Sequence, residues 1–180
     1  TYDAVYVATP NALHPDHAVA AARLGKHVLC EKPLGATVAG AERIVDACDE
    51  AGVPLMTAYR MQAHPVVRRL RAFLDDGGVG DPVQLHGGFV FPVLAGSRGP
   101  DHWRLDPDLA GGGALMDVGV YPLNTTRFLL GREPTAVQAF ATGDGPFAGV
   151  DERIAFDLRF GERTTASFTA SFSGHADSRL

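Results

Sequence analysis

The sequence has few of the residues that mark secreted, metal-binding or nucleic-acid-binding proteins. Only two of its 180 residues are cysteines, Cys30 and Cys48, and each lies in an apolar segment, which favours two buried free thiols over a disulfide or a metal pair. The formal net charge is −5 and no basic run is present, which argues against a groove for a polyanion. We therefore expect no nucleic-acid partner, no metal, and a reducing, cytoplasmic setting.

Long hydrophobic runs are lacking as well. No apolar stretch approaches the roughly 20 residues that a membrane-spanning helix requires. The first three residues, 1–3, have neither the basic nor the apolar region of a signal peptide. The sequence therefore predicts a globular protein with no membrane contact.

Lysine is scarce, and this draws attention to one of the two lysines, Lys26 and Lys32. Lys32 lies in the turn Glu31-Lys32-Pro33, directly after an apolar strand, at the end of the strand where open α/β sheets bind their ligands. An ammonium group is a compact charge whose pKa shifts readily with its surroundings, whereas a guanidinium stays charged. Lys32 is therefore a candidate functional residue, and a solvated lysine in a turn is the alternative.

The first 60 residues alternate between strands and helices. Apolar runs predict strands at 3–9, 27–30 and 54–59, the first of them buried on both faces. Between them we expect helices at 14–24 and 38–51, the second capped by Thr37 and stopped by Gly52. Short links between these elements predict a parallel sheet with right-handed crossovers, the C-terminal half of a Rossmann-type α/β sheet.

The glycine-rich turn of a Rossmann domain is absent. No G-x-G-x-x-G motif precedes Asp3, and no apolar strand leads into the run Gly111-Gly112-Gly113. Either the phosphate-binding half lies outside this sequence, or the chain does not bind a dinucleotide. We favour the first interpretation, in which residues 1–60 are the C-terminal part of a dinucleotide-binding domain and lack its first strands.

Residues 61–180 indicate a second domain of α+β type with an open, mostly antiparallel sheet. The expected elements are a helix at 65–76, a strand at 83–92 with a bulge at Gly87-Gly88, an irregular loop at 93–113, a helix at 114–130, and strands at 136–142, 151–160 and 163–172. The last two strands alternate apolar and polar residues and would be joined by the two-residue turn Gly161-Glu162. We expect the sheet to continue beyond Leu180.

Two helices carry predicted stripes of side chains. The first helix would bury Val66, Val67, Leu70, Phe73 and Leu74, and the second would bury Met116, Val120 and Leu123. Pro122 would kink or break the second helix. Asp117, Tyr121 and Asn124 would lie along one edge of it and could point into one cleft. For Tyr121, periodicity alone favours a core aromatic over a functional residue.

The motifs of the chain together resemble those of the Gfo/Idh/MocA family of NAD(P)-dependent oxidoreductases. They are Thr9-Pro10-Asn11 with His14, the run 25–34 with its Glu31-Lys32-Pro33 turn, Tyr59-Arg60, and the run 112–121. The segments 103–107 and 121–124 resemble the branch that contains glucose-fructose oxidoreductase and the NADP-dependent D-xylose 1-dehydrogenase of haloarchaea. The resemblance covers nearly the whole chain, in the order that the family shows.

The resemblance implies roles for individual residues. Lys32 would lie between nicotinamide and substrate, and Asp117 and Tyr121 would hold the substrate-side acid and proton-transfer positions. The positions implied to contact the cofactor are Thr9, Pro10, Asn11, His14, Glu31, Lys32, Arg60, Trp103 and Arg104. It further implies NADP as cofactor with NAD as the alternative, a small sugar as substrate, and a homo-oligomer formed through the C-terminal sheet.

These residue types fit the oxidation of an aldose such as D-xylose or D-glucose at C1. A phenol ordinarily ionises at about pH 10, so Tyr121 would serve as base only if a cation such as Lys32 stabilises its phenolate. Asp117 would bind a sugar hydroxyl or hold the lysine, and the sequence leaves both roles open. The alternatives are a dehydrogenase of an inositol or a trans-dihydrodiol, and a non-catalytic nucleotide-sensing regulator of the same fold.

Overall fold

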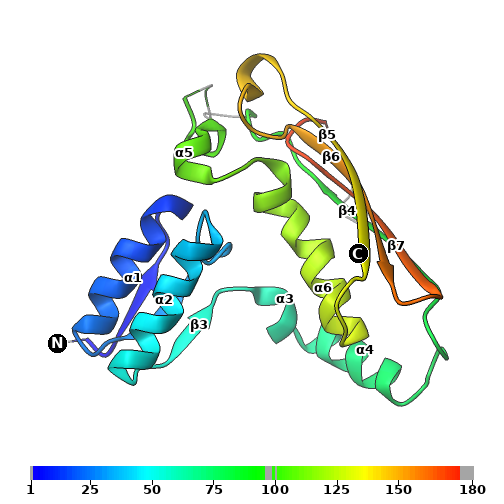
Figure 1. Cartoon of the computed structure of the whole chain (residues 1–180), viewed down its shortest axis with the longest axis horizontal. Helices are drawn as coiled ribbons and strands as arrows, with labels where there is room; N and C mark the ends of the chain where they lie inside the picture. Colours follow the sequence, from blue (N-terminus) through cyan, green and yellow to red (C-terminus); the bar gives the residue numbers. More distant parts are fainter. Residues whose placement is uncertain (1, 96–98, 100, 175–180) are drawn as a thin grey trace.

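The computed structural model describes residues 2–95, 99 and 101–174, which form two sheets with helices packed on them (Figure 1). In chain order the elements are β1 (Ala4–Val7), η1 (Asn11–Leu13), α1 (His14–Arg23), β2 (His27–Cys30), α2 (Val38–Ala51), β3 (Leu55–Thr57), α3 (Arg60–Ala63), α4 (Pro65–Asp75), β4 (Gln84–Val90), η2 (Trp103–Leu105), α5 (Pro107–Ala110), η3 (Leu115–Gly119), α6 (Val120–Leu130), β5 (Ala136–Thr142), η4 (Gly145–Phe147), β6 (Arg153–Phe160) and β7 (Thr164–Ser171).

The first sheet is parallel, with strand order β1-β2-β3, as the sequence predicts. Helix α2 begins and ends where expected, because the Thr37 side chain accepts a hydrogen bond from the Gly40 N–H at 3.1 Å and Gly52 takes the left-handed conformation with φ of 64°. Strands β1 and β3 are shorter than predicted. The division into domains at residue 60 stays a prediction.

Only one face of this sheet is buried, which corrects the prediction that the first strand is buried on both faces. Val7, Val28 and Cys30 pack under α1 and α2, which lie side by side in Figure 1. On the opposite face Tyr6 is 55% exposed and Met56 is 57% exposed. In the described part of the chain, both helices that cover this sheet pack on the same face, so the other face stays open.

Both thiols are free and buried, as predicted from their apolar surroundings. Burial raises the pKa of Cys30 to about 12 and also raises the pKa of Cys48. Because the thiolate is the nucleophile, the raised pKa values disfavour reaction of either sulfur in the folded chain.

We expect a thiol reagent such as Ellman's reagent to leave Cys30 and Cys48 unmodified in the folded protein at about pH 8. Both thiols should react rapidly once denaturant is added, because unfolding removes their burial. The absorbance of the released thiolate measures the number of reactive groups, and the denatured sample is the control. Rapid reaction of either thiol without denaturant would contradict the buried environment seen here.

The second sheet has the order β4-β7-β6-β5 and is antiparallel except for the β4–β7 pair, which confirms the open, mostly antiparallel sheet. The alternating apolar residues of β6 and β7 face one core, as predicted. The opposite face leaves β5 exposed, where Phe140 is 81% exposed. Helix α6 packs against the covered side, beside β4 (Figure 1).

Two predicted details of this sheet are wrong. The β4–β7 register runs residue for residue through Gly87 and Gly88, so there is no bulge. A Cβ at Gly88 would lie 2.7 Å from the Thr169 hydroxyl oxygen, and the glycine is needed for this close approach. The β6–β7 turn has three residues, 161–163, because Phe160 pairs with Thr164.

The expected stripe of α4 is also largely wrong. Only Val67 is buried, whereas Val66, Leu70 and Phe73 are exposed. Helix α4 contacts α3 and α6 along one narrow side, so most of its apolar face has no cover in the described part of the chain. The loop expected at 93–113 contains the short helices η2 and α5.

The helix predicted at 114–130 begins as a π-helical turn, η3, and continues as α6. The Val120 N–H binds the Leu115 carbonyl, an i→i−5 bond that makes this turn wider than an α-helical one. The wider turn rotates the buried face, so Val118 and Pro122 are buried while Met116, Val120 and Leu123 are only partly buried. Pro122 follows closely after the π-helical turn, so the predicted kink or break corresponds to the junction between η3 and α6.

None of the helices within residues 2–95, 99 and 101–174 has the length and apolarity needed to cross a bilayer. The segment 175–180 lies outside the described residues.

Candidate functional site

The site is built around an ion pair between the two parts of the chain. Lys32 follows β2 and Asp117 lies in the π-helical turn, and the lysine Nζ is 2.8 Å from Asp117 Oδ1. The same Nζ also donates to the Asp117 backbone carbonyl. The side chains are only 11% and 14% exposed, so the pair is weakly screened by solvent. Lys32 is thus a held ammonium group at a strand end and not a solvated turn lysine.

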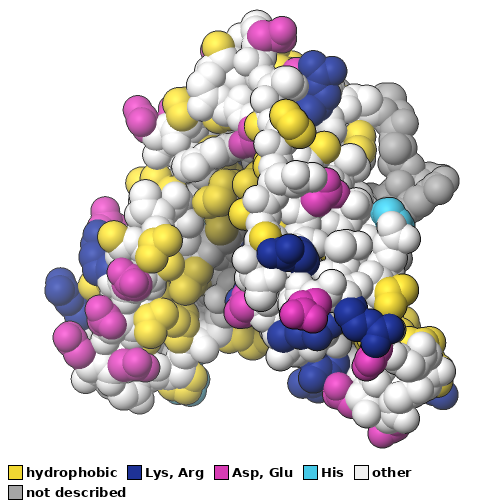
Figure 2. Space-filling model, turned by 45° about the vertical axis from the view of Figure 1, so that its right-hand side comes forward, with side chains coloured by type: hydrophobic (Ala, Val, Ile, Leu, Met, Phe, Trp, Pro, Cys, Tyr) yellow, Lys and Arg dark blue, Asp and Glu magenta, His cyan; other side chains and the backbone are white. Residues whose placement is uncertain are grey.

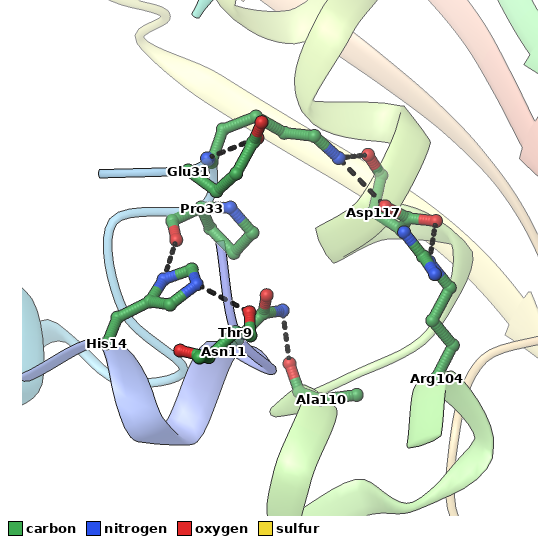
Figure 3. Close-up of polar contacts among 9 residues, drawn as sticks. Thr9, Asn11, His14, Glu31, Pro33, Arg104, Ala110 and Asp117 are labelled. Atoms are coloured by element: carbon green, nitrogen blue, oxygen red, sulfur yellow. Dashed lines mark hydrogen bonds and ion pairs between the residues drawn. The ribbon is translucent and has the colours of Figure 1, made fainter. Parts of the chain in front are cut away.

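A second cation binds the other oxygen of the same carboxylate. Arg104, in η2, places its Nε 2.8 Å from Asp117 Oδ2 (Figure 3). The Arg104 guanidinium also lies 4.5 Å from the centre of the Trp103 ring. Since both carboxylate oxygens of Asp117 face cations, the geometry supports the role of holding Lys32 over that of binding a sugar hydroxyl.

Tyr121 lies directly beside this ion pair, on the first turn of α6. Lys32 Nζ is 5.0 Å from the centre of its ring, and the Arg60 guanidinium carbon is 5.7 Å away. Tyr59 and Phe89 stack against the ring, each with centroids 5.6 Å apart from it. The ring is partly exposed, and within the described part of the chain its hydroxyl has no hydrogen-bond partner. Lys32 therefore approaches the face of the phenol ring and does not hydrogen-bond to its hydroxyl.

Tyr59, which the sequence marked only as part of a motif, fixes the start of α6. Its hydroxyl donates to the Tyr121 carbonyl at 2.8 Å and lies 3.0 Å from the Thr125 hydroxyl. Burial raises the pKa of Tyr59 to about 12, so it remains a neutral phenol at physiological pH. Tyr59 thus joins the end of β3 to the helix that carries Tyr121.

His14 joins the two loops that follow β1 and β2. The ring is fully buried, with Nε2 2.8 Å from the Thr9 carbonyl and Nδ1 3.0 Å from the Pro33 carbonyl (Figure 3). Both ring nitrogens are engaged by protein atoms, which leaves no ring nitrogen for a ligand. The buried ring of His14 therefore holds the loops after β1 and β2 together.

Asn11 and Glu31 also make contacts within the chain. Asn11 is buried and donates from Nδ2 to the Ala110 carbonyl at 2.8 Å, which links the loop after β1 to α5. The Glu31 carboxylate accepts hydrogen bonds from the Tyr6 hydroxyl and from the Lys32 backbone N–H. The bond to Glu31 raises the pKa of Tyr6. Pro10 lies between β1 and η1, beside these residues.

A cavity of about 690 Å³ opens where the ends of β2 and β3 meet α3 and α6. Polar side chains in its wall include Lys32, Thr57, Gln62, Arg68 and Asn124. Asn124 also accepts a hydrogen bond from Arg127 at 2.8 Å. Figure 2 shows the surface hollowed between two parts of the molecule, with hydrophobic side chains along the hollow. Of the predicted edge, only Asn124 lines this cavity, whereas Asp117 and Tyr121 contact Lys32 itself.

Comparison with known sequences finds a match to two family profiles that cover most of the chain. Residues 67–180 match the GFO/IDH/MocA C-terminal domain, and residues 1–59 match the oxidoreductase family with a NAD-binding Rossmann fold. The D-xylose 1-dehydrogenase [NADP(+)] of Haloarcula marismortui is 49% identical over 181 residues, which cover 99% of this chain and 50% of the relative. A D-xylose 1-dehydrogenase (NADP(+)) of Haloferax volcanii is 42% identical over 170 residues, 94% of this chain and 50% of the relative.

Solved structures show the same likeness. The aldose-aldose oxidoreductase from Caulobacter crescentus, complexed with glycerol, has a TM-score of 0.88 at 41% identity, covering 95% of this chain and 51% of that protein. A levoglucosan dehydrogenase in complex with NADH and levoglucosan has a TM-score of 0.86 at 30% identity, and the match covers 98% of this chain and 50% of that protein. The chain thus spans about half the length of the relatives that it matches.

Proposed function

Because the chain belongs to the Gfo/Idh/MocA family of oxidoreductases, we propose that it forms part of an NADP-dependent sugar dehydrogenase. The proposed reaction oxidises an aldose such as D-xylose or D-glucose at C1. Residues 1–60 would complete a Rossmann domain, and residues 61–180 would form the substrate-binding and oligomerisation domain. The relatives named as D-xylose 1-dehydrogenases support the aldose and the choice of NADP over NAD.

One observation carries this proposal: the Lys32–Asp117 ion pair lies beside the face of a phenol at the carboxyl end of a parallel sheet. Ligands of such sheets bind at this edge. A held cation next to a tyrosine is the arrangement that proton removal from a sugar hydroxyl requires, since the cation stabilises the phenolate. A nucleotide sensor without catalysis would have no use for it.

The residues at the ends of β1 and β2 fit a nicotinamide cofactor. His14 holds the loops of Thr9 and Pro33 together, so these strand ends form one continuous edge. We propose that Thr9, Pro10, Asn11 and Glu31 lie along the nicotinamide ribose. Arg60, Trp103 and Arg104 would lie near the cofactor from the side of the second sheet. When bound, the oxidised nicotinamide accepts a hydride from the substrate carbon.

The protein would supply alignment and proton transfer. Tyr121 takes the proton of the anomeric hydroxyl as the C1–H bond gives up its hydride, and the sugar becomes a lactone. Lys32 and Arg60 stabilise the tyrosinate through their charges, and Asp117 holds Lys32 in place. Arg104 holds Asp117 from its second oxygen, so the carboxylate cannot swing away from the lysine.

The proposal is tested by the near-ultraviolet absorbance of reduced nicotinamide, measured on a polypeptide that joins this chain to the glycine-rich half of a Rossmann domain. D-xylose, D-glucose, an inositol and a trans-dihydrodiol are each offered with NADP and with NAD. We expect an aldose with NADP to give the fastest reduction. Reduction by the inositol or the dihydrodiol alone would overturn the substrate class. Cofactor binding without any turnover would support the regulator instead.

A further inference from the structure

Asp151 receives three consecutive backbone N–H groups at the start of the helical segment that carries Asp117 and Tyr121. Its Oδ1 accepts from Gly113 at 2.7 Å, its Oδ2 accepts from Leu115 at 2.6 Å, and its own carbonyl accepts from Ala114 at 2.7 Å. These donors would otherwise be unsatisfied, because the first turn of a helix has no acceptors for them. One residue thus clamps the whole start of the segment.

The clamp is anchored on the second sheet. Val150, just before Asp151, is buried, and just after it the Glu152 N–H binds the Thr142 carbonyl at the end of β5 at 2.8 Å. The Glu152 carbonyl accepts the Phe172 N–H directly after β7. The position of Asp151 is therefore set by backbone hydrogen bonds to the ends of two strands, β5 and β7.

The helical segment also approaches Asp151 too closely for any side chain at Gly113. A Cβ at Gly113 would lie 2.0 Å from the Asp151 carbonyl oxygen, so only glycine fits there. The Gly113 carbonyl then accepts the Asp117 N–H at 3.1 Å. A chain of short contacts therefore runs from the sheet through Asp151 and Gly113 to the backbone of Asp117, whose carbonyl and carboxylate both bind Lys32.

We propose that Asp151 is a positioning residue for the proposed reaction: it fixes where the helix begins and thereby where Asp117 presents its oxygens to Lys32. This inference rests on the proposed function only for its effect on turnover, because the effect on Lys32 is a property of the chain itself. Its carboxylate also carries the negative charge that a helix N-terminus favours. Both oxygens are occupied by the backbone, so Asp151 contacts no substrate.

The variant Asp151→Asn distinguishes the positioning of Asp117 from a general contribution of Asp151 to the stability of the fold. Asparagine keeps the size of the side chain but turns one acceptor oxygen into an N–H donor, which faces a backbone N–H and displaces the helix start. The matched control is Asp144→Asn, in the same connection between β5 and β6, where the aspartate is exposed and caps no helix with its side chain.

The first measurement uses the fact that the chain has two lysines. An amine-acylating reagent is applied, and mass spectrometry gives the ratio of modified Lys32 to modified Lys26. We expect the ratio to rise severalfold in Asp151→Asn, because Lys32 is released from Asp117, and to stay at the wild-type value in Asp144→Asn. Global unfolding would also raise the acylation of Lys32, whose side chain is only 11% exposed in the fold, so the acylation is run well below the denaturant midpoint of each variant, where the chain stays folded.

The second measurement is turnover of the aldose by the complete polypeptide. We expect kcat to fall by about 10- to 100-fold, as for a catalytic group misplaced by up to about 1 Å, with a smaller change in KM. An unchanged acylation ratio and unchanged kcat in a variant of lower stability would overturn the positioning role. If Asp151→Asn does not fold, the acylation ratio and kcat of Asp151→Ser test the positioning role instead. If no substrate turns over at all, the proposed function fails while the lysine ratio still tests Asp151.

Discussion

Replacing Lys32 by methionine is expected to lower kcat for the aldose by about 10²- to 10³-fold. The Lys32 ammonium lies 5.0 Å from the centre of the Tyr121 ring and is almost buried. At about 5 Å and an effective dielectric constant of about 20, two unit charges interact by about 3 kcal/mol, which is roughly a 10²-fold effect on rate. Loss of proton-transfer assistance adds to this value. Steady-state kinetics of the complete polypeptide measure the change.

The same substitution at the other lysine is the control. Lys26 lies in the turn between α1 and β2, with its Nζ 5.2 Å from the Tyr2 ring, and Lys26→Met should leave kcat unchanged. Lys32→Arg keeps the charge but cannot place one compact donor on both the carbonyl and the carboxylate of Asp117, so we expect little recovery. Full activity of Lys32→Met would remove Lys32 from the proposed reaction.

Replacing Tyr121 by phenylalanine should cost about 10²- to 10⁴-fold in kcat, the usual contribution of a proton-transferring group. The change removes one hydroxyl and keeps the ring, so the stacking against Tyr59 and Phe89 persists. In the described residues that hydroxyl has no partner to lose, and we expect the free energy of unfolding to change by less than about 0.5 kcal/mol. Denaturant unfolding and steady-state kinetics together separate the two effects.

A matched control separates the loss of the Tyr121 hydroxyl from the loss of a tyrosine hydroxyl in general. Tyr2→Phe, which removes a hydroxyl from an exposed tyrosine, serves as the matched control. Wild-type kcat in Tyr121→Phe would show that another group accepts the proton.

The sequence correctly predicts those helices and strands whose boundaries or buried faces depend on residues only a few positions apart. Helix α2 is delimited by the Thr37 cap and the left-handed Gly52, and both act through residues a few positions away. Strand β6 alternates strictly between core and surface, and β7 follows the same pattern except at its end, where Ser171 is buried beside Ala170. Lys32, Asp117 and Tyr121 were likewise found from motifs, and the structure brings them together.

The remaining features depend on residues far apart in the chain. The π-helical turn shifts the buried face of the helix, and it is held by Asp151, which the sequence predicts only as the first residue of a strand. Arg104 was predicted near the cofactor, but nothing local indicated its bond to Asp117. The stripe of α4 was overestimated because periodicity tells which residues share a face and not whether anything covers that face.

The contact between Arg104 and Trp103 gives the protein an optical property. Trp103 is the only tryptophan of the chain, and its ring is stacked under a guanidinium that also binds Asp117. Indole emission responds to nearby charge, so the tryptophan fluorescence of the chain, excited where tyrosine does not absorb, originates at one place, next to the carboxylate that holds Lys32. We therefore expect the wavelength of this emission to shift when Arg104 leaves Asp117.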